Sequence, residues 1–134
     1  MHDRRSATAD PRSMIQYKSA LALEDDPMIG FALEDMLLEI GFREVHLVTT
    51  IAQAHLALER GLPSAAVLDV NIRGERSYAF AMHLVANKIP FVFATGYGDS
   101  EHPDELRVIP TITKPYSVSD IRAAIMQATS QNAS

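Results

Sequence analysis

The chain has 134 residues, no cysteine and a net charge of −5 at neutral pH. Its length and its 47% hydrophobic and 22% charged residues fit one globular domain that can bury a full core without disulfides. The absence of cysteine excludes a disulfide framework, a cysteine-ligated zinc site and a thiol nucleophile. The negative charge argues against direct binding of nucleic acid, and no apolar run approaches the roughly 20 residues that span a bilayer. We therefore expect a cytoplasmic protein without membrane contact.

The two ends of the chain differ in composition from the part between them. The first residues contain arginines but no apolar core after them, which does not fit a secretory signal. We expect residues 1–17 to be a flexible N-terminal tail, residues 18–130 to form the folded domain and residues 131–134 to be a C-terminal tail.

Short apolar runs alternate with amphipathic segments throughout the domain. The apolar runs predict strands, in chain order, at 20–23, 45–48, 65–70, 91–95 and 108–113. The amphipathic segments predict helices at 27–40, 51–60, about 75–88 and 118–128. Three pairs of residues are typical helix starts: Asp26 with Pro27, Thr50 with Gln53, and Ser117 with Asp120.

The helix patterns also indicate which side chains face the core. The apolar stripe of the first helix includes Met28, Leu33 and Leu37, and the third helix offers Phe80, Leu84 and Val85. Residues 96–107 contain two glycines and a proline, so we expect no more than a short or irregular fourth helix there.

The alternation predicts an α/β fold. Continuous apolar strands separated by helices are typical of a parallel sheet that is covered on both faces. Five such units predict a flavodoxin-like (βα)5, doubly wound, five-stranded parallel sheet. Ligands of these sheets bind at the carboxyl ends of the strands.

Polar side chains lie where the predicted strands end. The first strand ends at Glu24-Asp25-Asp26, the third at Asp69, the fourth at Thr95, and the fifth just before Lys114. Because the strands are parallel, these residues should meet at one edge of the sheet. A lone Asp in an apolar strand is costly to bury unless it is paired, so Asp69 should have a partner at this edge.

The chemistry of this residue set favours a phosphorylated aspartate. Three neighbouring carboxylates repel one another unless a cation lies between them, and Mg²⁺ binds one or two carboxylates together with waters and phosphate. Lys114 offers a point cation and Thr95 a hydroxyl donor to phosphoryl oxygens. Asp69 would then be a carboxylate nucleophile.

The same residues resemble the conserved pieces of bacterial response-regulator receiver domains. The matching pieces are Glu24-Asp25-Asp26-Pro27, Leu68-Asp69-Val70-Asn71, Ala94-Thr95-Gly96 and Lys114-Pro115-Tyr116. They follow the family's order and spacing over roughly 18–129. Phe93-Ala94-Thr95-Gly96 further resembles the signature of a group of single-domain receivers.

The resemblance implies a phosphorelay function. Asp69 would accept a phosphoryl group from a sensor histidine kinase or a histidine phosphotransfer protein, with Thr95 and Lys114 holding the group. The Lys114–Pro115 peptide bond would be cis. The receiver would catalyse only its own phosphorylation and hydrolysis, and it would act as a stand-alone protein through contact with an unknown downstream protein or as a phosphate sink.

The resemblance also implies a Mg²⁺ site. Asp25 and Asp69 would be direct ligands, Glu24 would act mainly through water, and Asn71 would contribute its backbone carbonyl.

Two other functions remain open from the sequence. The same fold can serve as a non-phosphorylated interaction module. A phosphohydrolase of the haloacid-dehalogenase type also forms an aspartyl phosphate, but it needs a second acid two residues after the nucleophile, where this chain has Asn71.

One position departs from the receiver pattern. Many receivers have an aromatic residue three positions before the lysine, and that aromatic couples to the threonine during switching. Here the position is Thr111. Tyr97 or Tyr116 could replace the aromatic, or both tyrosines could be partly packed surface residues.

Overall fold

The computed structural model describes residues 17–96 and 102–133. The predicted N-terminal tail, apart from Tyr17, lies outside these residues, as does Tyr97. The last helix continues through Ala133, beyond the predicted domain boundary at residue 130.

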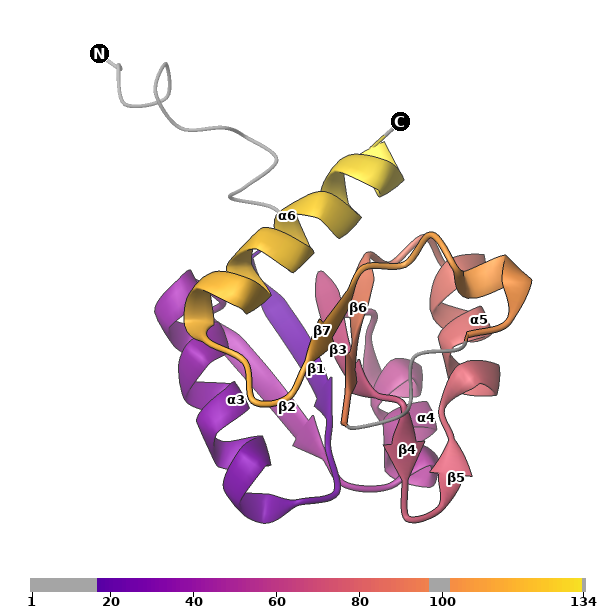
Figure 1. The fold of residues 1–134 in the computed structure, drawn as a ribbon, viewed down its shortest axis with the longest axis horizontal. Helices are drawn as coiled ribbons and strands as arrows, with labels where there is room; N and C mark the ends of the chain where they lie inside the picture. Colours follow the sequence, from indigo (N-terminus) through magenta and orange to yellow (C-terminus); the bar gives the residue numbers. More distant parts are fainter. Residues whose placement is uncertain (1–16, 97–101, 134) are drawn as a thin grey trace.

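The centre of the fold is a five-stranded parallel sheet (Figure 1). Its strands are β1 (Ser19–Leu23), β2 (Glu44–Val48), β3 (Ala65–Asp69), β6 (Phe91–Thr95) and β7 (Thr111–Thr113). They lie in the order β2-β1-β3-β6-β7. The crossover from β2 past β1 to β3 makes the sheet doubly wound, which confirms the flavodoxin-like fold predicted from the sequence.

Helices cover both faces of the sheet. In Figure 1, α3 and α6 lie on one side, and α4 and α5 lie on the other. Their bounds are α3 (Pro27–Ile40), α4 (Ile51–Arg60), α5 (Tyr78–Ala86) and α6 (Val118–Ala133). Where the sequence predicted a short or irregular fourth helix, the described residues form only the 3-10 turn η1 (Asp104–Leu106).

The predicted caps hold the helix starts in place. Asp26 Oδ1 accepts hydrogen bonds from the backbone N–H groups of Met28 and Ile29 at 2.9 and 3.2 Å. Ser117 and Asp120 form a reciprocal capping box at 2.9 and 3.1 Å. These bonds satisfy amides that have no partner within the helix, and the first of them places the start of α3 directly beside the acidic residues after β1.

Alternate residues of the strands belong to two separate cores, one on each face of the sheet. Ala20, Ala22 and Val67 face α3 and α6, whereas Leu21 and Leu68 face α4 and α5. This double burial explains why the strands are apolar without alternation. Asp69 ends β3 with only 6% of its surface exposed.

Two of the predicted core side chains are in fact exposed. Met28 is 80% exposed and Val85 is 43% exposed. Met28 lies in the first turn of α3, which in Figure 1 extends below the ends of the strands, so the sheet does not cover it. In α5 the smaller set of Phe80, Ala81 and Leu84 contacts the sheet, and Val85 lies outside that face.

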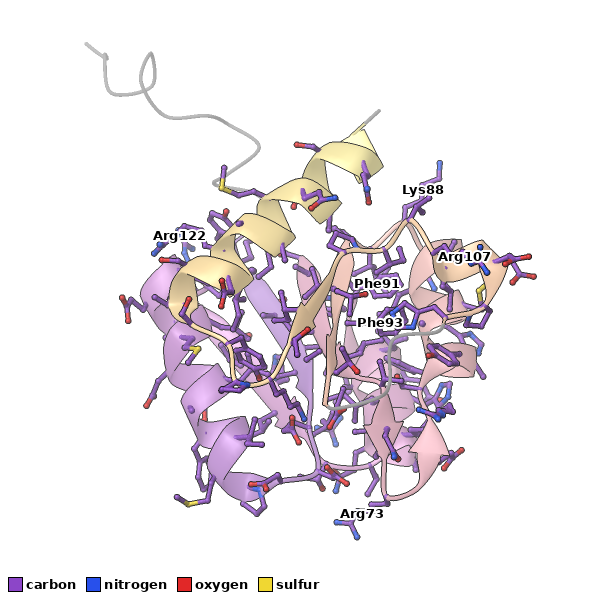
Figure 2. The ribbon with its side chains drawn as sticks, in the orientation of Figure 1. Arg73, Lys88, Phe91, Phe93, Arg107 and Arg122 are labelled. Atoms are coloured by element: carbon purple, nitrogen blue, oxygen red, sulfur yellow. The ribbon has the colours of Figure 1, made fainter. Side chains whose placement is uncertain are left out.

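A small hairpin follows β3 where the sequence predicted the start of a helix. Strands β4 (Asn71–Ile72) and β5 (Glu75–Arg76) pair antiparallel across a two-residue turn. Both turn residues have positive φ, 54° at Arg73 and 84° at Gly74, as a primed hairpin turn requires. Figure 2 shows Arg73 directed away from the protein at the hairpin tip.

Candidate functional site

The sheet brings the predicted site residues to one edge. In the strand register, Asp69 lies beside Ala94, and Thr95 lies beside Thr113. Glu24 and Lys114 directly follow β1 and β7. Parallel register therefore gathers residues from four strands that are far apart in sequence.

Both carboxylate oxygens of Asp69 have a partner. Lys114 Nζ donates to Asp69 Oδ2 at 2.8 Å, and the backbone N–H of Asn71 donates to Oδ1 at 3.2 Å. These contacts compensate the cost of burying the charge. They also fix the orientation of the carboxylate.

Lys114 is shared between two acids. Its Nζ lies 2.8 Å from Glu24 Oε1 as well as 2.8 Å from Asp69 Oδ2. Burial alone lowers the pKa of Lys114, but its contacts with Asp69 and Glu24 outweigh burial, and the net pKa is raised. The ammonium group is therefore firmly charged.

Glu24 is the most deeply buried acid of the site, with 1% of its surface exposed. Burial is the largest influence on the pKa of Glu24 and raises it; contacts with Lys114 and with the backbone N–H of Asp26 lower it, the charge of Asp69 raises it, and the net pKa is raised. Asp26 N donates to Glu24 Oε2 at 3.0 Å. One lysine thus balances two buried carboxylates only in part.

Asp25 completes an acidic cluster at the mouth of the site. One carboxylate oxygen from each of Glu24, Asp25 and Asp69 lies within 4.8 Å of the others. Asp25 Oδ2 accepts a hydrogen bond from the backbone N–H of Arg73 at 2.9 Å, so the hairpin closes over this side. Three oxygen donors at this spacing fit a hard divalent cation.

An open hollow of about 290 Å³ adjoins the cluster. Its lining includes Asp25, Asp69, Asn71, Gly96 and Lys114. A group that enters it meets a carboxylate, an ammonium and glycine backbone. The hollow is therefore suited to a small anion that binds together with a cation.

Thr95 lies at the same edge of the sheet, but its hydroxyl is hydrogen-bonded to the backbone and does not line the hollow. Thr95 is 3% exposed, and its Oγ1 donates to the carbonyl of Gly96 at 3.0 Å. Gly96 lines the hollow, whereas Thr95 does not. A rotation of the side chain is needed before the hydroxyl could contact a ligand there.

Ser77 was not predicted as part of the site. It is fully buried, its Oγ donates to the carbonyl of Asp69 at 2.8 Å, and its N–H donates to the carbonyl of Val70 at 2.9 Å. Both bonds anchor the backbone that carries Asp69. The only sequence signal was a serine near a helix start, which is common at caps without any further role.

Two features lie next to Lys114 in the chain: a cis peptide bond and a half-buried tyrosine. The Lys114–Pro115 peptide bond is cis, as the receiver resemblance implied. Tyr116 is half-buried beside the site, and burial, together with the nearby charge of Glu24, raises its pKa to about 12. Its hydroxyl makes no hydrogen bond within the described part of the chain.

Solved structures share the overall fold of this chain. SdrG from Sphingomonas melonis Fr1 is 38% identical, with a TM-score of 0.76 over 84% of this chain and 97% of SdrG. The BeF3-activated conformation of SdrG, from Pseudomonas melonis Fr1, is 36% identical, with a TM-score of 0.71 over 86% of this chain and 97% of that one.

A third match carries the family name. The response-regulator REC domain of PhyR from Erythrobacter litoralis is 26% identical, with a TM-score of 0.68 over 83% of this chain and 88% of that domain. This chain belongs to the response-regulator receiver family. No protein-family model and no curated protein matches the sequence.

As a receiver, the chain has the fold of a signalling domain of two-component systems. Receivers bind Mg²⁺ at an acidic pocket, and this chain has an acidic cluster of Glu24, Asp25 and Asp69. No helix within residues 17–96 and 102–133 is long and apolar enough to cross a membrane.

Proposed function

We propose that this receiver accepts a phosphoryl group on Asp69 within a phosphorelay. The observation that carries the proposal is the position of Asp69, with the Lys114 ammonium 2.8 Å from Oδ2 and carboxylate oxygens of Glu24 and Asp25 within 4.8 Å. The hollow of about 290 Å³ beside it gives an incoming phosphoryl group access. A buried carboxylate with an open approach and a fixed cation is suited to nucleophilic attack on phosphorus.

The acidic residues would hold Mg²⁺. The donor set consists of carboxylate oxygens, which this ion prefers. Asp25 and Asp69 would be direct ligands, the backbone carbonyl of Asn71 would be a third, and Glu24 would act through water. The bound ion supplies positive charge beside the transferring group.

The chain's own residues would then perform the transfer. A carboxylate oxygen of Asp69 attacks the phosphorus of a phosphohistidine; the P–O bond forms as the P–N bond breaks, and the electron pair returns to the imidazole of the donor. Lys114 exchanges its contact with the free carboxylate for a contact with a phosphoryl oxygen. Thr95 turns its hydroxyl from Gly96 to a second oxygen.

The donor would be a sensor histidine kinase or a histidine phosphotransfer protein, and the output would be contact with another protein. Apart from this reaction and the hydrolysis of its product, we assign no catalytic activity to the chain. SdrG has been solved in a BeF3-activated conformation, which makes beryllofluoride the natural probe for the same site here. We also propose that the receiver acts as a stand-alone protein, as expected from the sequence.

Labelling with acetyl phosphate and Mg²⁺ tests the proposal. The wild-type protein should become labelled, and Asp69→Asn should not. Asp35→Asn, which alters an exposed acid of α3, is the matched control and should be labelled as the wild type is. Persistent labelling of Asp69→Asn would refute the assignment, and failure of the wild type to take up label or bind beryllofluoride would favour a non-phosphorylated interaction module.

A further inference from the structure

Thr111, which stands where many receivers have an aromatic residue, is hydrogen-bonded to a histidine from another segment. His102 lies just before η1. Its Nδ1 is 2.8 Å from Tyr78 Oη at the start of α5, and its Nε2 is 2.9 Å from Thr111 Oγ1 on β7. One imidazole therefore bridges a helix and a strand that are far apart in sequence.

The hydrogen bonds form a chain with one direction. Thr111 Oγ1 donates to the carbonyl of Ile109 at 3.3 Å, so it is free to accept from His102 Nε2–H. The Tyr78 hydroxyl then donates to an unprotonated Nδ1. This arrangement requires the neutral Nε2–H tautomer, and burial lowers the pKa of His102, which keeps the ring neutral at pH 7.

The imidazole also packs on the aromatic residues beneath it. Its ring centroid lies 4.6 Å from that of Phe93 and 5.4 Å from that of Tyr78. Phe93 is the strand partner of Thr111, so His102 covers the pair where β6 meets β7. Figure 2 shows Phe93 close to Phe91 on β6, and their ring centroids are 5.5 Å apart.

Each residue that holds His102 is close in sequence to a residue of the acceptor site. Tyr78 follows Ser77, whose Oγ donates to the carbonyl of Asp69 at 2.8 Å. Phe93 lies two residues before Thr95, on the same strand. Thr111 begins the short strand β7 that leads to Lys114.

The orientation of Thr95 indicates which state of the acceptor site the His102 bridge accompanies. In this structure its hydroxyl is bonded to the carbonyl of Gly96 at 3.0 Å. If Thr95 turns to a phosphoryl oxygen, the change occurs on β6, two residues from Phe93, whose ring packs against His102. The His102 bridge is thus formed in the arrangement in which Lys114 contacts the Asp69 carboxylate directly and Thr95 is bonded to Gly96.

We propose that His102 is the switch residue of this receiver: its bridge between Tyr78 and Thr111 stabilises the unphosphorylated state and opens when the acceptor site is filled. The inference rests on the proposed phosphorylation of Asp69. By linkage, a group that stabilises the empty state weakens binding of a phosphoryl mimic, and its removal strengthens that binding by the same factor.

The first test monitors the tautomer of His102 by two-bond ¹H–¹⁵N correlation NMR at pH 7. Its signals are identified by their absence from His102→Gln. The free protein should show one fixed Nε2–H tautomer, and beryllofluoride with Mg²⁺ should convert it to averaged signals. A fixed tautomer in both states, while the backbone amides of Asn71 and Lys114 shift, would overturn the coupling alone. No shift of those amides would overturn the phosphorylation proposal as well.

The second test is the affinity for beryllofluoride, read from the same amides. His102→Ala should bind at least about fivefold more tightly than the wild type, and His102→Gln, which keeps a donor and an acceptor, should lie between them. His46→Ala is the matched control, because the His46 side chain is 58% exposed on β2. Equal or weaker binding by a folded His102→Ala, with folding checked by its melting transition, would contradict the proposal.

Discussion

Lys114 Nζ lies 2.8 Å from Asp69 Oδ2, although the two residues are 45 positions apart in the sequence. The same ammonium contacts Glu24 Oε1, also at 2.8 Å. The cation of this site is thus already engaged before any phosphoryl group arrives. Charge balance at the sheet edge therefore links three residues whose removal should have distinct effects.

Replacing Lys114 by Met should destabilise the protein. Glu24 and Asp69 would stay buried without their cation, which should lower the free energy of unfolding by about 1–3 kcal/mol, since the site adjoins an open hollow. Millimolar Mg²⁺ should restore much of the loss. Urea unfolding at pH 7 measures both effects, with Lys18→Met on the exposed surface as control. Equal stability of Lys114→Met and wild type without Mg²⁺ would show that the contacts contribute little.

Replacing Glu24 by Gln should change how stability depends on pH. Burial raises the pKa of Glu24 in the folded state, so the folded protein binds a proton more readily than the unfolded chain. Without Mg²⁺, this group favours folding below the unfolded pKa of 4.5, and that advantage is lost as pH rises through the folded pKa. Glu24→Gln should lose this component of the pH profile of unfolding. An unchanged profile would mean that Glu24 has an ordinary pKa.

Replacing Phe31 by Ala should slow phosphotransfer from a protein donor but not from acetyl phosphate. Met28 and Phe31 are 80% and 61% exposed on α3, whose cap Asp26 adjoins the acidic cluster. We expect a donor that presents its phosphohistidine to Asp69 to contact this apolar surface. Phe31→Ala should reduce the rate from a cognate donor by about tenfold, the effect of losing one aromatic anchor.

Acetyl phosphate separates this effect from damage to the site. Its labelling of Phe31→Ala should equal that of the wild type, and Leu56→Ala on α4, where Leu56 is 56% exposed, should behave as the wild type with both donors. A slower reaction of Phe31→Ala with acetyl phosphate would place the defect in the acceptor site.

Replacing Tyr116 by Phe should leave stability equal or increase it by up to about 1 kcal/mol. The buried Tyr116 hydroxyl makes no hydrogen bond within the part of the chain that the structure describes, so its removal relieves a desolvation cost. Thermal unfolding measures the change. A loss of more than about 1 kcal/mol, which a hydrogen-bonded hydroxyl would produce, would contradict this expectation.

The sheet and its acidic edge could be predicted because their signals are local and repeated. Apolar strands of this length indicate burial on both faces, and parallel register then places Glu24, Asp69 and Lys114 together without knowledge of any contact. The caps at Asp26 and Ser117 depend on neighbours within three residues, which a sequence displays directly. The roles of the site residues in phosphoryl transfer stay predictions.

Other features depend on contacts that a sequence does not display. The turn at Arg73-Gly74 lacks the Asn-Gly or Asp-Gly pair that signals such hairpins, so the start of α5 was placed too early. Val85 fits an apolar stripe but lies outside the face of α5 that is buried in the core. His102 gained its importance only from Tyr78 and Thr111, which approach it from separate elements.

The most direct test of the central claim is to locate the acyl phosphate itself. The wild-type protein would be phosphorylated with acetyl phosphate and Mg²⁺, reduced with borohydride, which converts an aspartyl phosphate to homoserine, and digested for peptide sequencing by mass spectrometry. We predict homoserine at position 69 and unmodified residues at Glu24 and Asp25. Homoserine at another aspartate, with position 69 unchanged, would contradict the account.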